Sequence, residues 1–282
     1  MGAAAQPYFA AVPIEQVEAF WNRQPCNSRH SPQPVGSRAY FEEIDARRYF
    51  VQPHILRFAD FARWSGTRVL EIGCGIGTDT MRFAQAGARV TAVDLSEASL
   101  QIARQRAQVL GLADRVTFHR ADAERLNEAV PPEPYDLVYA FGVLHHTPHP
   151  ERAMQLIRER YVHAESAVKL MVYHRHAYKV LGILLTEGHG QWRRLDELVA
   201  RHSEAQTGCP ITYTYSRASV RRLLAGFRIT DLQVDHIFPW RVTDYVRYRY
   251  RKVWQFRLLP EPMFHQLERW FGWHLCVTAH PT

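Results

Sequence analysis

The feature that most constrains this 282-residue chain is a glycine-rich segment, Val69-Leu-Glu-Ile-Gly-Cys-Gly-Ile-Gly77, which is followed by a second apolar run, Val90-Thr-Ala-Val-Asp-Leu95. The pattern predicts a buried strand, a glycine turn that opens a helix, and a second strand that ends in a carboxylate. Glycines let the backbone approach a ligand closely, and a carboxylate in this place receives ribose hydroxyls. The segment therefore predicts a site for a nucleoside-containing cofactor.

The spacing of the glycines distinguishes between cofactors. A dinucleotide site has the pattern G-x-G-x-x-G, with its third glycine where the helix packs on the strand. Here Gly73, Gly75 and Gly77 follow G-x-G-x-G, and Thr78 occupies the position of the dinucleotide motif's third glycine. The spacing therefore disfavours a dinucleotide and hydride chemistry.

The segment Glu71–Gly77 together with Asp94 resembles the S-adenosylmethionine pocket of class I methyltransferases. Further segments continue the resemblance in the expected order, over about residues 65–175: Val116–His119 with Asp122-Ala-Glu124, Tyr135–Tyr139, and Phe141–Pro150. The chain is most similar to small-molecule methyltransferases of quinone biosynthesis and natural-product pathways. The resemblance implies an enzyme that uses S-adenosyl-L-methionine and releases S-adenosyl-L-homocysteine.

Strand and helix patterns alternate from Thr67 onward, which predicts an α/β fold with a parallel sheet and a ligand crevice at the carboxyl ends of its strands. The resemblance implies a Rossmann-like, seven-stranded, mostly parallel sheet with helices on both faces. It also implies that the last strand, Gly272–Ala279, lies antiparallel beside the fifth, Ala167–Tyr173. We expect residues 1–64 to form an N-terminal helical cap. Residues 65–282 then form the methyltransferase domain, with acceptor-site insertions at about 176–215 and 237–270.

Composition places the chain among globular proteins of the reducing cytoplasm. Hydrophobic residues make up 46% of it, which supports a sizeable core. The sequence contains no stretch of 18 or more apolar residues, so no membrane-spanning helix is predicted. The first seven residues lack the pattern of a secretory signal. Four cysteines without paired spacing fit a cytoplasmic location. No feature of the sequence sets an oligomeric state.

The charge is unevenly distributed. The chain has 35 Lys and Arg against 28 Asp and Glu, a net charge of +7, and the excess gathers in Arg217–Arg228 and Arg247–Lys252. Such a cluster fits a phosphate-rich partner, an anionic membrane surface or an acidic small substrate. It also fits a solvated helix face whose arginines extend their charged ends into water while their stems cover apolar surface.

The resemblance assigns roles around the expected cofactor. Gly73, Gly75 and Gly77 would lie against its amino-acid part, and Asp94 would accept both ribose hydroxyls. Asp122 would accept the adenine amino group while Ala123 offers its backbone N–H, although Asp122 also fits the N-cap of a helix. The predicted cofactor-binding set is completed by Glu71, Cys74, Thr78, Leu95 and Phe141.

Methyl transfer from a sulfonium is an in-line displacement, so the protein mainly aligns the nucleophile, excludes water and, for an oxygen nucleophile, removes a proton. The candidate bases are His145 and His146 at the end of the fourth strand, of which we expect one to face the crevice. Either histidine would otherwise pack or bond backbone in the loop. Tyr173, at the end of the fifth strand, is a further catalytic candidate.

The acceptor site is predicted from the cap and the insertions. The candidate substrate-binding residues are Tyr40, His174, Tyr213, Tyr215 and Arg241. Aromatic residues of the insertions indicate a partly apolar, ring-bearing acceptor, and arginines would hold an acidic group on it. The further residues behind this expectation are Trp192, Trp240, Tyr245, Tyr248, Arg38 and Arg247.

Three alternatives accompany this interpretation. A metal site is not predicted, because His145-His-x-x-His149 and His174-x-His176 lack the spacing of known histidine sites. Methylation of RNA or protein would use the basic C-terminal insertion, although Ala140-Phe-Gly-Val143 stands where enzymes that methylate exocyclic base amines carry Asn/Asp-Pro-Pro-aromatic. A non-catalytic cofactor-binding module is the third possibility.

Overall fold

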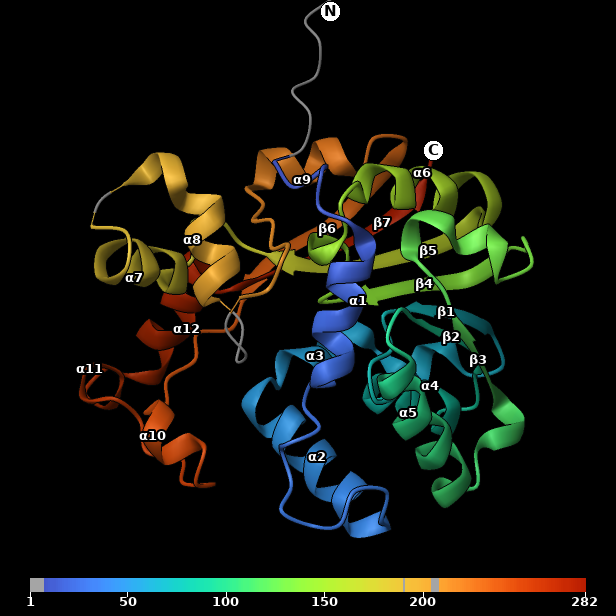
Figure 1. The fold of residues 1–282 in the computed structure, drawn as a ribbon, viewed down its shortest axis with the longest axis horizontal. Coiled ribbons are helices and arrows are strands. Elements are labelled where there is room, and N and C mark those ends of the chain that lie inside the picture. The colour runs from blue at the N-terminus through green and yellow to red at the C-terminus, as the bar shows by residue number, and fades with distance from the viewer. Residues whose placement is uncertain (1–7, 190, 204–207) are drawn as a thin grey trace, which may run out of the picture.

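The computed structural model describes residues 8–189, 191–203 and 208–282 and contains one seven-stranded sheet. The strands lie in the order β3-β2-β1-β4-β5-β7-β6, and β7 runs antiparallel to both of its neighbours. The expected mostly parallel sheet with an antiparallel last strand beside the fifth is thereby confirmed (Figure 1). The strands are β1 (Arg68–Ile72), β2 (Arg89–Asp94), β3 (Val116–Arg120), β4 (Tyr135–Phe141), β5 (Val162–Tyr173), β6 (Phe227–Asp235) and β7 (His274–Pro281).

Helices cover both faces of the sheet because successive strand residues point to opposite sides. Leu70 and Ile72 of β1 belong to the apolar core that also includes Ile157 of α6, whereas Val69 belongs to the core that includes Met81 of α4. The helices between the strands are α4 (Thr78–Gln85), α5 (Glu97–Leu110), α6 (Pro150–Arg160) and α9 (Arg217–Leu223). Short 3₁₀ turns join them: η2 (Ala113–Arg115), η3 (Ala123–Glu128) and η4 (Leu144–His146).

The N-terminal segment forms helices α1 (Ile14–Arg23), α2 (Arg38–Val51) and α3 (His54–Ala59) and the turn η1 (Phe61–Trp64). The Ser37 hydroxyl accepts from the Tyr40 N–H at 3.1 Å and so forms the N-cap of α2. The Asn22 side-chain oxygen accepts from the Ser96 hydroxyl at 2.8 Å and so fastens α1 to the start of α5. The bond between Asn22 and Ser96 thus links the N-terminal helices to the part of the chain that follows them.

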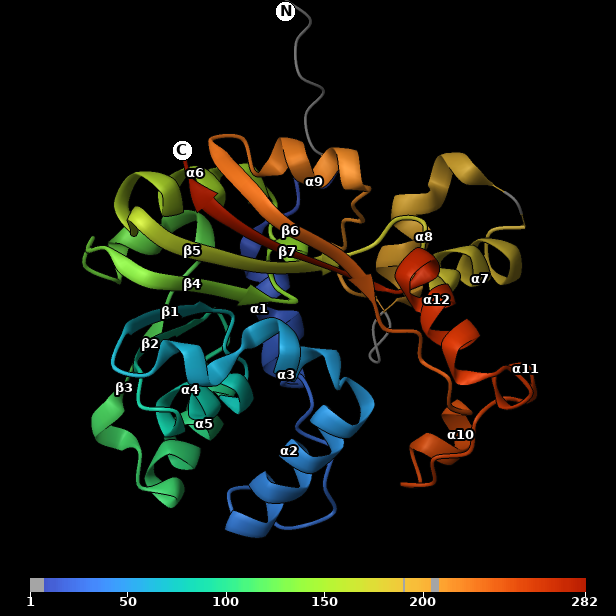
Figure 2. The same ribbon diagram turned by 180° about the vertical axis from the view of Figure 1, so that it is seen from behind.

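Both predicted insertions are mainly helical. The first contains α7 (Tyr178–Thr186), η5 (Trp192–Arg194) and α8 (Leu195–His202), and the second α10 (Val242–Tyr245), α11 (Trp254–Arg257) and α12 (Glu261–Phe271). Figures 1 and 2 show these helices gathered at one end of the molecule, beside β6 and β7. The first seven residues, predicted not to be a secretory signal, and the Trp192 side chain lie outside what the structure describes.

None of the described helices combines the length and apolar character needed to cross a membrane.

Candidate functional site

The glycine turn is held against the second strand by two backbone hydrogen bonds. The N–H groups of Gly73 and Cys74 both donate to the Val93 carbonyl, at 2.7 and 2.9 Å. Gly73 has φ +74°, and a Cβ atom added there would lie 2.0 Å from a methyl carbon of Val143. Because of this close approach and the left-handed backbone, only glycine fits here.

Asp94 closes the turn from the end of β2. Its two carboxylate oxygens accept from the Gly75 N–H at 2.7 Å and from the Ser96 N–H at 2.8 Å. Burial raises the pKa of Asp94 to about 6, although these backbone bonds favour the ionised form. Each carboxylate oxygen has a second lone pair, so the side chain can accept further donors from a ligand.

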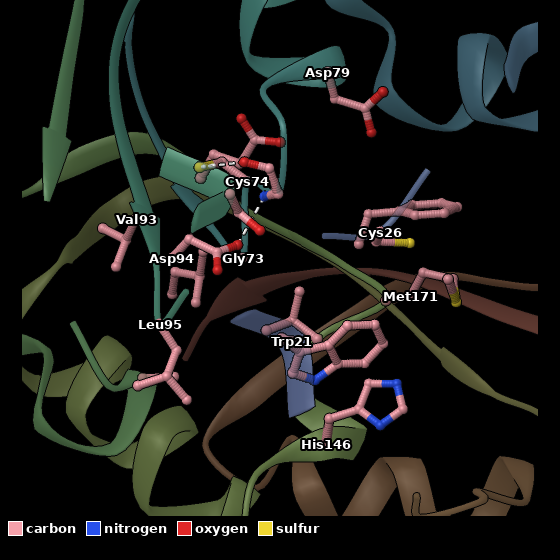
Figure 3. A pocket seen from close by; sticks show the side chains of 18 of the residues that line it. Trp21, Cys26, Gly73, Cys74, Asp79, Val93, Asp94, Leu95, His146 and Met171 are labelled. Atoms are coloured by element: carbon pink, nitrogen blue, oxygen red, sulfur yellow. Dashed lines mark hydrogen bonds between the residues drawn. The ribbon is translucent and has the colours of Figure 1, made fainter. Parts of the chain in front are cut away.

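A cavity of about 220 Å³ lies against the turn (Figure 3). Of the eleven residues predicted to bind a cofactor, ten line it; the exception is Gly77, which forms the N-cap of α4 and packs near Ala103 instead. The ten are Glu71, Gly73, Cys74, Gly75, Thr78, Asp94, Leu95, Asp122, Ala123 and Phe141. The local sequence pattern thus identified one wall of a real cavity.

Asp122 both caps a helical turn and lines the cavity. Its carboxylate accepts from the Glu124 N–H at 2.9 Å and caps η3, and the residue also lines the cavity. Burial raises the pKa of this carboxyl. Glu124 in turn accepts from the Thr147 hydroxyl and the His149 N–H, both at 2.6 Å. The loop after β4 is therefore tied to the loop after β3.

The two adjacent histidines have different surroundings. His146 lines the cavity, with its ring 5.2 Å from that of Trp21 and its Nδ1 2.7 Å from the Ile211 carbonyl oxygen. Because a carbonyl only accepts, Nδ1 of the neutral ring carries the proton and Nε2 carries the lone pair.

His145 is fully buried beneath Tyr173, with ring centroids 3.8 Å apart, and does not line the cavity. Among the described residues neither of its ring nitrogens has a hydrogen-bond partner. Burial lowers the pKa of His145 well below its ordinary value, which holds the ring neutral. The turn η4 therefore points His145 into the core and away from the cavity, and this position does not support its predicted role as a base.

Tyr173 does line the cavity, as predicted, and its ring stacks on Trp273 at 4.0 Å.

The five predicted substrate-binding residues do not line the cavity. Tyr40 is fully buried, and its hydroxyl donates to the Ser28 carbonyl at 2.7 Å. The Tyr213 hydroxyl accepts from the Phe9 N–H at 2.9 Å and donates to the Pro148 carbonyl at 3.2 Å. These two phenols are used to hold loops together.

The remaining three are also structural or peripheral. Tyr215 lies in the main apolar core, and His174 places Nδ1 3.2 Å from the Gly272 carbonyl oxygen. Arg241 is exposed at the N-terminus of α10. No described residue of the two insertions lines the cavity. The assignment of the insertions to an acceptor site therefore finds no support in the lining of this cavity and stays a prediction.

The N-terminal helices supply the wall that we assigned to the insertions. Its residues are Ile14, Val17, Trp21, Cys26, Asn27, Arg48 and Gln52. Figure 3 shows Trp21 and His146 on the side of the cavity away from the glycine turn. A tryptophan in a short amphipathic helix gives no sign in the sequence of which surface it will cover.

A buried ionic network lies behind the turn and was not predicted. Asp79 of α4 accepts from Arg48 and from the Tyr49 hydroxyl, both at 2.8 Å, and from the Tyr139 hydroxyl at 3.1 Å. Nearby Glu71 accepts from Thr80, and burial raises the pKa of Glu71 to about 8. Arg48 lies four residues after the apolar Ile44, so both side chains are on one face of the helix. A charged side chain on an apolar face needs a partner, and this signal would have predicted the ion pair of Arg48.

Among the residues that the structure describes, no group of three or more His, Cys, Asp or Glu side chains is arranged to hold a metal ion.

Comparison with known proteins agrees with this geometry. Residues 69–162 match a family described as a methyltransferase domain. A ubiquinone biosynthesis O-methyltransferase of Bordetella parapertussis is 42% identical over 86 residues, which cover 30% of this chain and 34% of that protein. A 27-O-demethylrifamycin SV methyltransferase of Amycolatopsis mediterranei is 40% identical over 85 residues, 30% of each chain. The matched part spans about a third of the length of these curated relatives.

Solved structures extend the similarity over the whole fold. A magnesium protoporphyrin IX methyltransferase from Synechocystis PCC 6803 with bound S-adenosylhomocysteine gives a TM-score of 0.59 at 18% identity, covering 96% of this chain and 100% of the other. A geranyl diphosphate C-methyltransferase from Streptomyces coelicolor gives 0.59 at 13% identity, covering 99% and 100%.

The chain thus carries a methyltransferase domain, residues 69–162, within a fold that it shares with solved methyltransferases, in agreement with the resemblance seen in the sequence. The part that carries the family match, residues 69–162, begins with the glycine turn and includes Asp94, Asp122 and His146.

Proposed function

We propose that this chain transfers a methyl group from S-adenosyl-L-methionine to an oxygen or nitrogen of a small, partly apolar metabolite. The observation that carries the proposal is the cavity in which the glycine turn, Asp94 and Asp122 meet. The similarity to O-methyltransferases of quinone and rifamycin pathways supports it.

The donor would be held by groups that the fold already positions. The glycine turn leaves room for the amino-acid part, and no atom lies within 4 Å of a Cβ added at Gly75. Asp94 would accept the ribose hydroxyls with the lone pairs that Gly75 and Ser96 leave available. Asp122 would accept from the adenine amino group, with the Ala123 N–H directed to the ring.

His146 is the proposed base for an oxygen acceptor. The donor's S–CH₃ bond breaks while the O–CH₃ bond forms, and the hydroxyl proton passes to Nε2 of His146. The Ile211 carbonyl holds the ring in the tautomer that this step needs. Since the sulfonium is already activated, the remaining contribution of the protein is alignment and exclusion of water.

The acceptor side of the cavity fits an apolar molecule. Its wall includes Trp21, Val143, Met171 and Tyr173. We propose that residues 1–64 act as the cap over this side, in place of the insertions, because α1 and α2 supply wall residues to the cavity.

Donor binding is tested with Asp94→Ala and titration calorimetry of S-adenosylhomocysteine. We expect binding to fall below detection, because the ribose loses its main acceptor. The matched control is Asp114→Ala, which removes an exposed carboxylate from η2. Wild-type affinity in Asp94→Ala would reject the cofactor assignment.

The role of His146 is tested by turnover. His146→Ala should lower methylation of a panel of phenols, quinols and amines by about a hundredfold for oxygen acceptors, within the range for loss of a general base. Affinity for S-adenosylhomocysteine should persist in the variant. Unchanged turnover with oxygen acceptors would reject the role of His146 as a base without contradicting the proposed cofactor site.

The two alternative functions have distinct signatures. A methyltransferase acting on RNA or protein would lose affinity for its macromolecule steeply with salt through the basic insertion. A non-catalytic module would bind the donor and methylate no member of the panel.

A further inference from the structure

Exposed apolar side chains are concentrated on the helices of the two insertions. Fifteen large hydrophobic side chains of the described residues are strongly exposed, and eleven of them lie in α7 or between residues 242 and 271. The eleven are Tyr178, Leu181, Leu185, Val242, Val246, Tyr248, Trp254, Leu258, Met263, Trp270 and Phe271. Exposed apolar groups scattered singly need no explanation, but a concentration of this kind marks a contact surface.

The exposed positions follow helical spacing. On α7 Tyr178, Leu181 and Leu185 recur at intervals of three and four residues, and on α12 Met263 and Trp270 are seven apart. This spacing places the side chains of each helix on one face. In a soluble domain such a face normally packs on the core, whereas Leu185 is 62% exposed and Trp270 is 58% exposed.

Aromatic contacts join these helices into one surface. The rings of Tyr178 on α7 and Phe256 on α11 lie 5.6 Å apart, and those of Phe256 and Phe264 on α12 lie 5.4 Å apart. Figures 1 and 2 show α7, α11 and α12 together at the end of the molecule. We call Leu181, Leu185, Trp254, Leu258, Met263 and Trp270 the apolar face.

Positive charge accompanies the apolar face. Residues 237–272 contain seven Lys or Arg and three Asp or Glu, a net charge of +4 in a chain whose total is +7. Arg247, Arg249, Arg251 and Arg257 are exposed, and none of them forms an ion pair with any residue that the structure describes. This part of the surface is therefore complementary to an anionic partner.

The combination of side chains favours a lipid surface over RNA. RNA-binding surfaces stack bases on exposed aromatic rings. Here Tyr250 contacts both Trp240 and Tyr245, with centroids 5.6 and 6.1 Å apart, whereas Trp254 and Trp270 are exposed, so aromatic rings alone suit either partner. The exposed groups include aliphatic Leu185 and Leu258, which recognise neither a base nor a phosphate.

We propose that the apolar face and the arginines beside it dock the protein peripherally on an anionic phospholipid bilayer. Leucine, methionine and tryptophan side chains enter the boundary between head groups and acyl chains, and the arginines pair with lipid phosphates. The docking does not depend on methyl transfer, because the apolar face and the cavity share no residues.

The test measures binding of the full chain to vesicles by sedimentation. We expect vesicles with three parts phosphatidylglycerol to seven parts phosphatidylcholine to bind at least about tenfold more tightly than pure phosphatidylcholine, since each basic residue near the surface contributes about 1 kcal/mol. The combined change Trp254→Ser and Leu258→Ser should weaken binding at least about fivefold. Arg249→Ser with Arg251→Ser and Arg257→Ser should weaken it at least about tenfold and reduce its salt dependence.

Matched controls alter exposed residues elsewhere. Val35→Ser with Leu56→Ser removes two exposed apolar groups, and Arg152→Ser with Arg160→Ser removes two exposed arginines of α6. Both should change vesicle affinity less than about twofold. All variants should keep wild-type circular dichroism and affinity for S-adenosylhomocysteine, so a folding defect or a failed donor site is distinguished from lost docking.

Three results would overturn the proposal. One is equal binding to both kinds of vesicle, or none. The second is tight binding of a single-stranded RNA that the arginine variant abolishes while vesicles do not bind. The third is a dimer that becomes a monomer in the Trp254 and Leu258 variant, again without vesicle binding.

Discussion

Arg48 and Asp79 form a buried ion pair, with 2.8 Å between Nη2 and Oδ2, that joins the N-terminal helix α2 to the helix opened by the glycine turn. The side chains are 15% and 3% exposed, and both residues line the cavity. Asp79 also accepts from Tyr49 and Tyr139, so a single carboxylate fastens α2 and β4 to the back of the turn.

Removing the cation from this pair should destabilise the fold strongly. Arg48→Met leaves the Asp79 charge buried beside two neutral donors, and loss of one partner of a buried pair costs about 3–5 kcal/mol. Arg104→Met breaks a pair with Glu97 whose side chains are 40% and 38% exposed, and it should cost less than about 1 kcal/mol. Urea unfolding measures both free energies. Equal losses would show that the Arg48 pair contributes no more than a surface pair.

The glycine turn gives a second prediction. Gly73→Ala should reduce the free energy of unfolding more than Gly111→Ala, because the two glycines have nearly the same φ, +74° and +71°, and different neighbours. The new methyl group would collide with Val143 at position 73, whereas at position 111 nothing lies within 4 Å. We expect a difference of about 1–3 kcal/mol, the usual cost of overpacking.

A suppressor makes this comparison sharper. Val143→Ala removes the two methyl carbons that lie 2.0 and 2.6 Å from the added Cβ, so it should recover part of the stability lost in Gly73→Ala. It should recover nothing in Gly111→Ala. If Val143→Ala gives no recovery in the first background, the collision is not the cause of the loss.

The wall of the cavity at the glycine turn was predictable because its signals are local. A buried strand, a glycine turn and the carboxylate at the end of the next strand lie within 26 residues, from Val69 to Asp94, and each has a distinct residue pattern. The parallel order of the strands follows from that alternation. The fourth and fifth strands were predicted for the same reason.

The other wall of the cavity was not predictable from local patterns. Whether Trp21 or Tyr213 faces the cavity depends on which segment folds over the sheet, and aromatic residues look alike in either place. His145 and His146 differ only in the direction that the turn η4 gives each ring. The ring of Tyr40 lies away from the cavity, and its hydroxyl donates to a backbone carbonyl within the N-terminal segment.

Donor affinity should depend on pH through Asp94. Burial raises its pKa to about 6, and ligand hydroxyls bond best to the ionised form. Affinity for S-adenosylhomocysteine should therefore fall as the pH drops from 7 to 5, by up to about tenfold per unit below pH 6. Asp94→Asn should bind S-adenosylhomocysteine weakly, and its affinity should change little between pH 7 and 5. Asp114→Asn should show the same dependence of affinity on pH as the wild type. A steep slope in Asp94→Asn would assign the titration to another group.

Stability at acid pH should depend on buried histidines. Nε2 of His54 lies 2.9 Å from Nδ1 of His274, and burial lowers the pKa of His54 to about 3. The unfolded chain takes up this proton near pH 6.5, so the stabilisation is complete above that pH and is lost as the pH falls toward 3. His54 alone contributes a slope of about 1.4 kcal/mol per pH unit in that window.

Replacing His54 measures its contribution to the pH dependence of the unfolding free energy. His54→Gln keeps an acceptor for His274 and should flatten the dependence of the unfolding free energy on pH by about one proton. His265→Gln, at an exposed position on α12, is the matched control. Parallel slopes for wild type and His54→Gln, between pH 4 and 6.5, would refute the assignment.

The cavity is built by residues from both ends of the chain, with Ile14 on α1 and His274 on β7 among its walls. A ribosome that has completed the glycine turn and Asp94 has therefore made only one side of the binding site. Competence to hold the donor should arise only once β7 has inserted between β5 and β6. Donor binding then reports that the fold is complete, and a chain halted before β7 should gain no stability from the ligand.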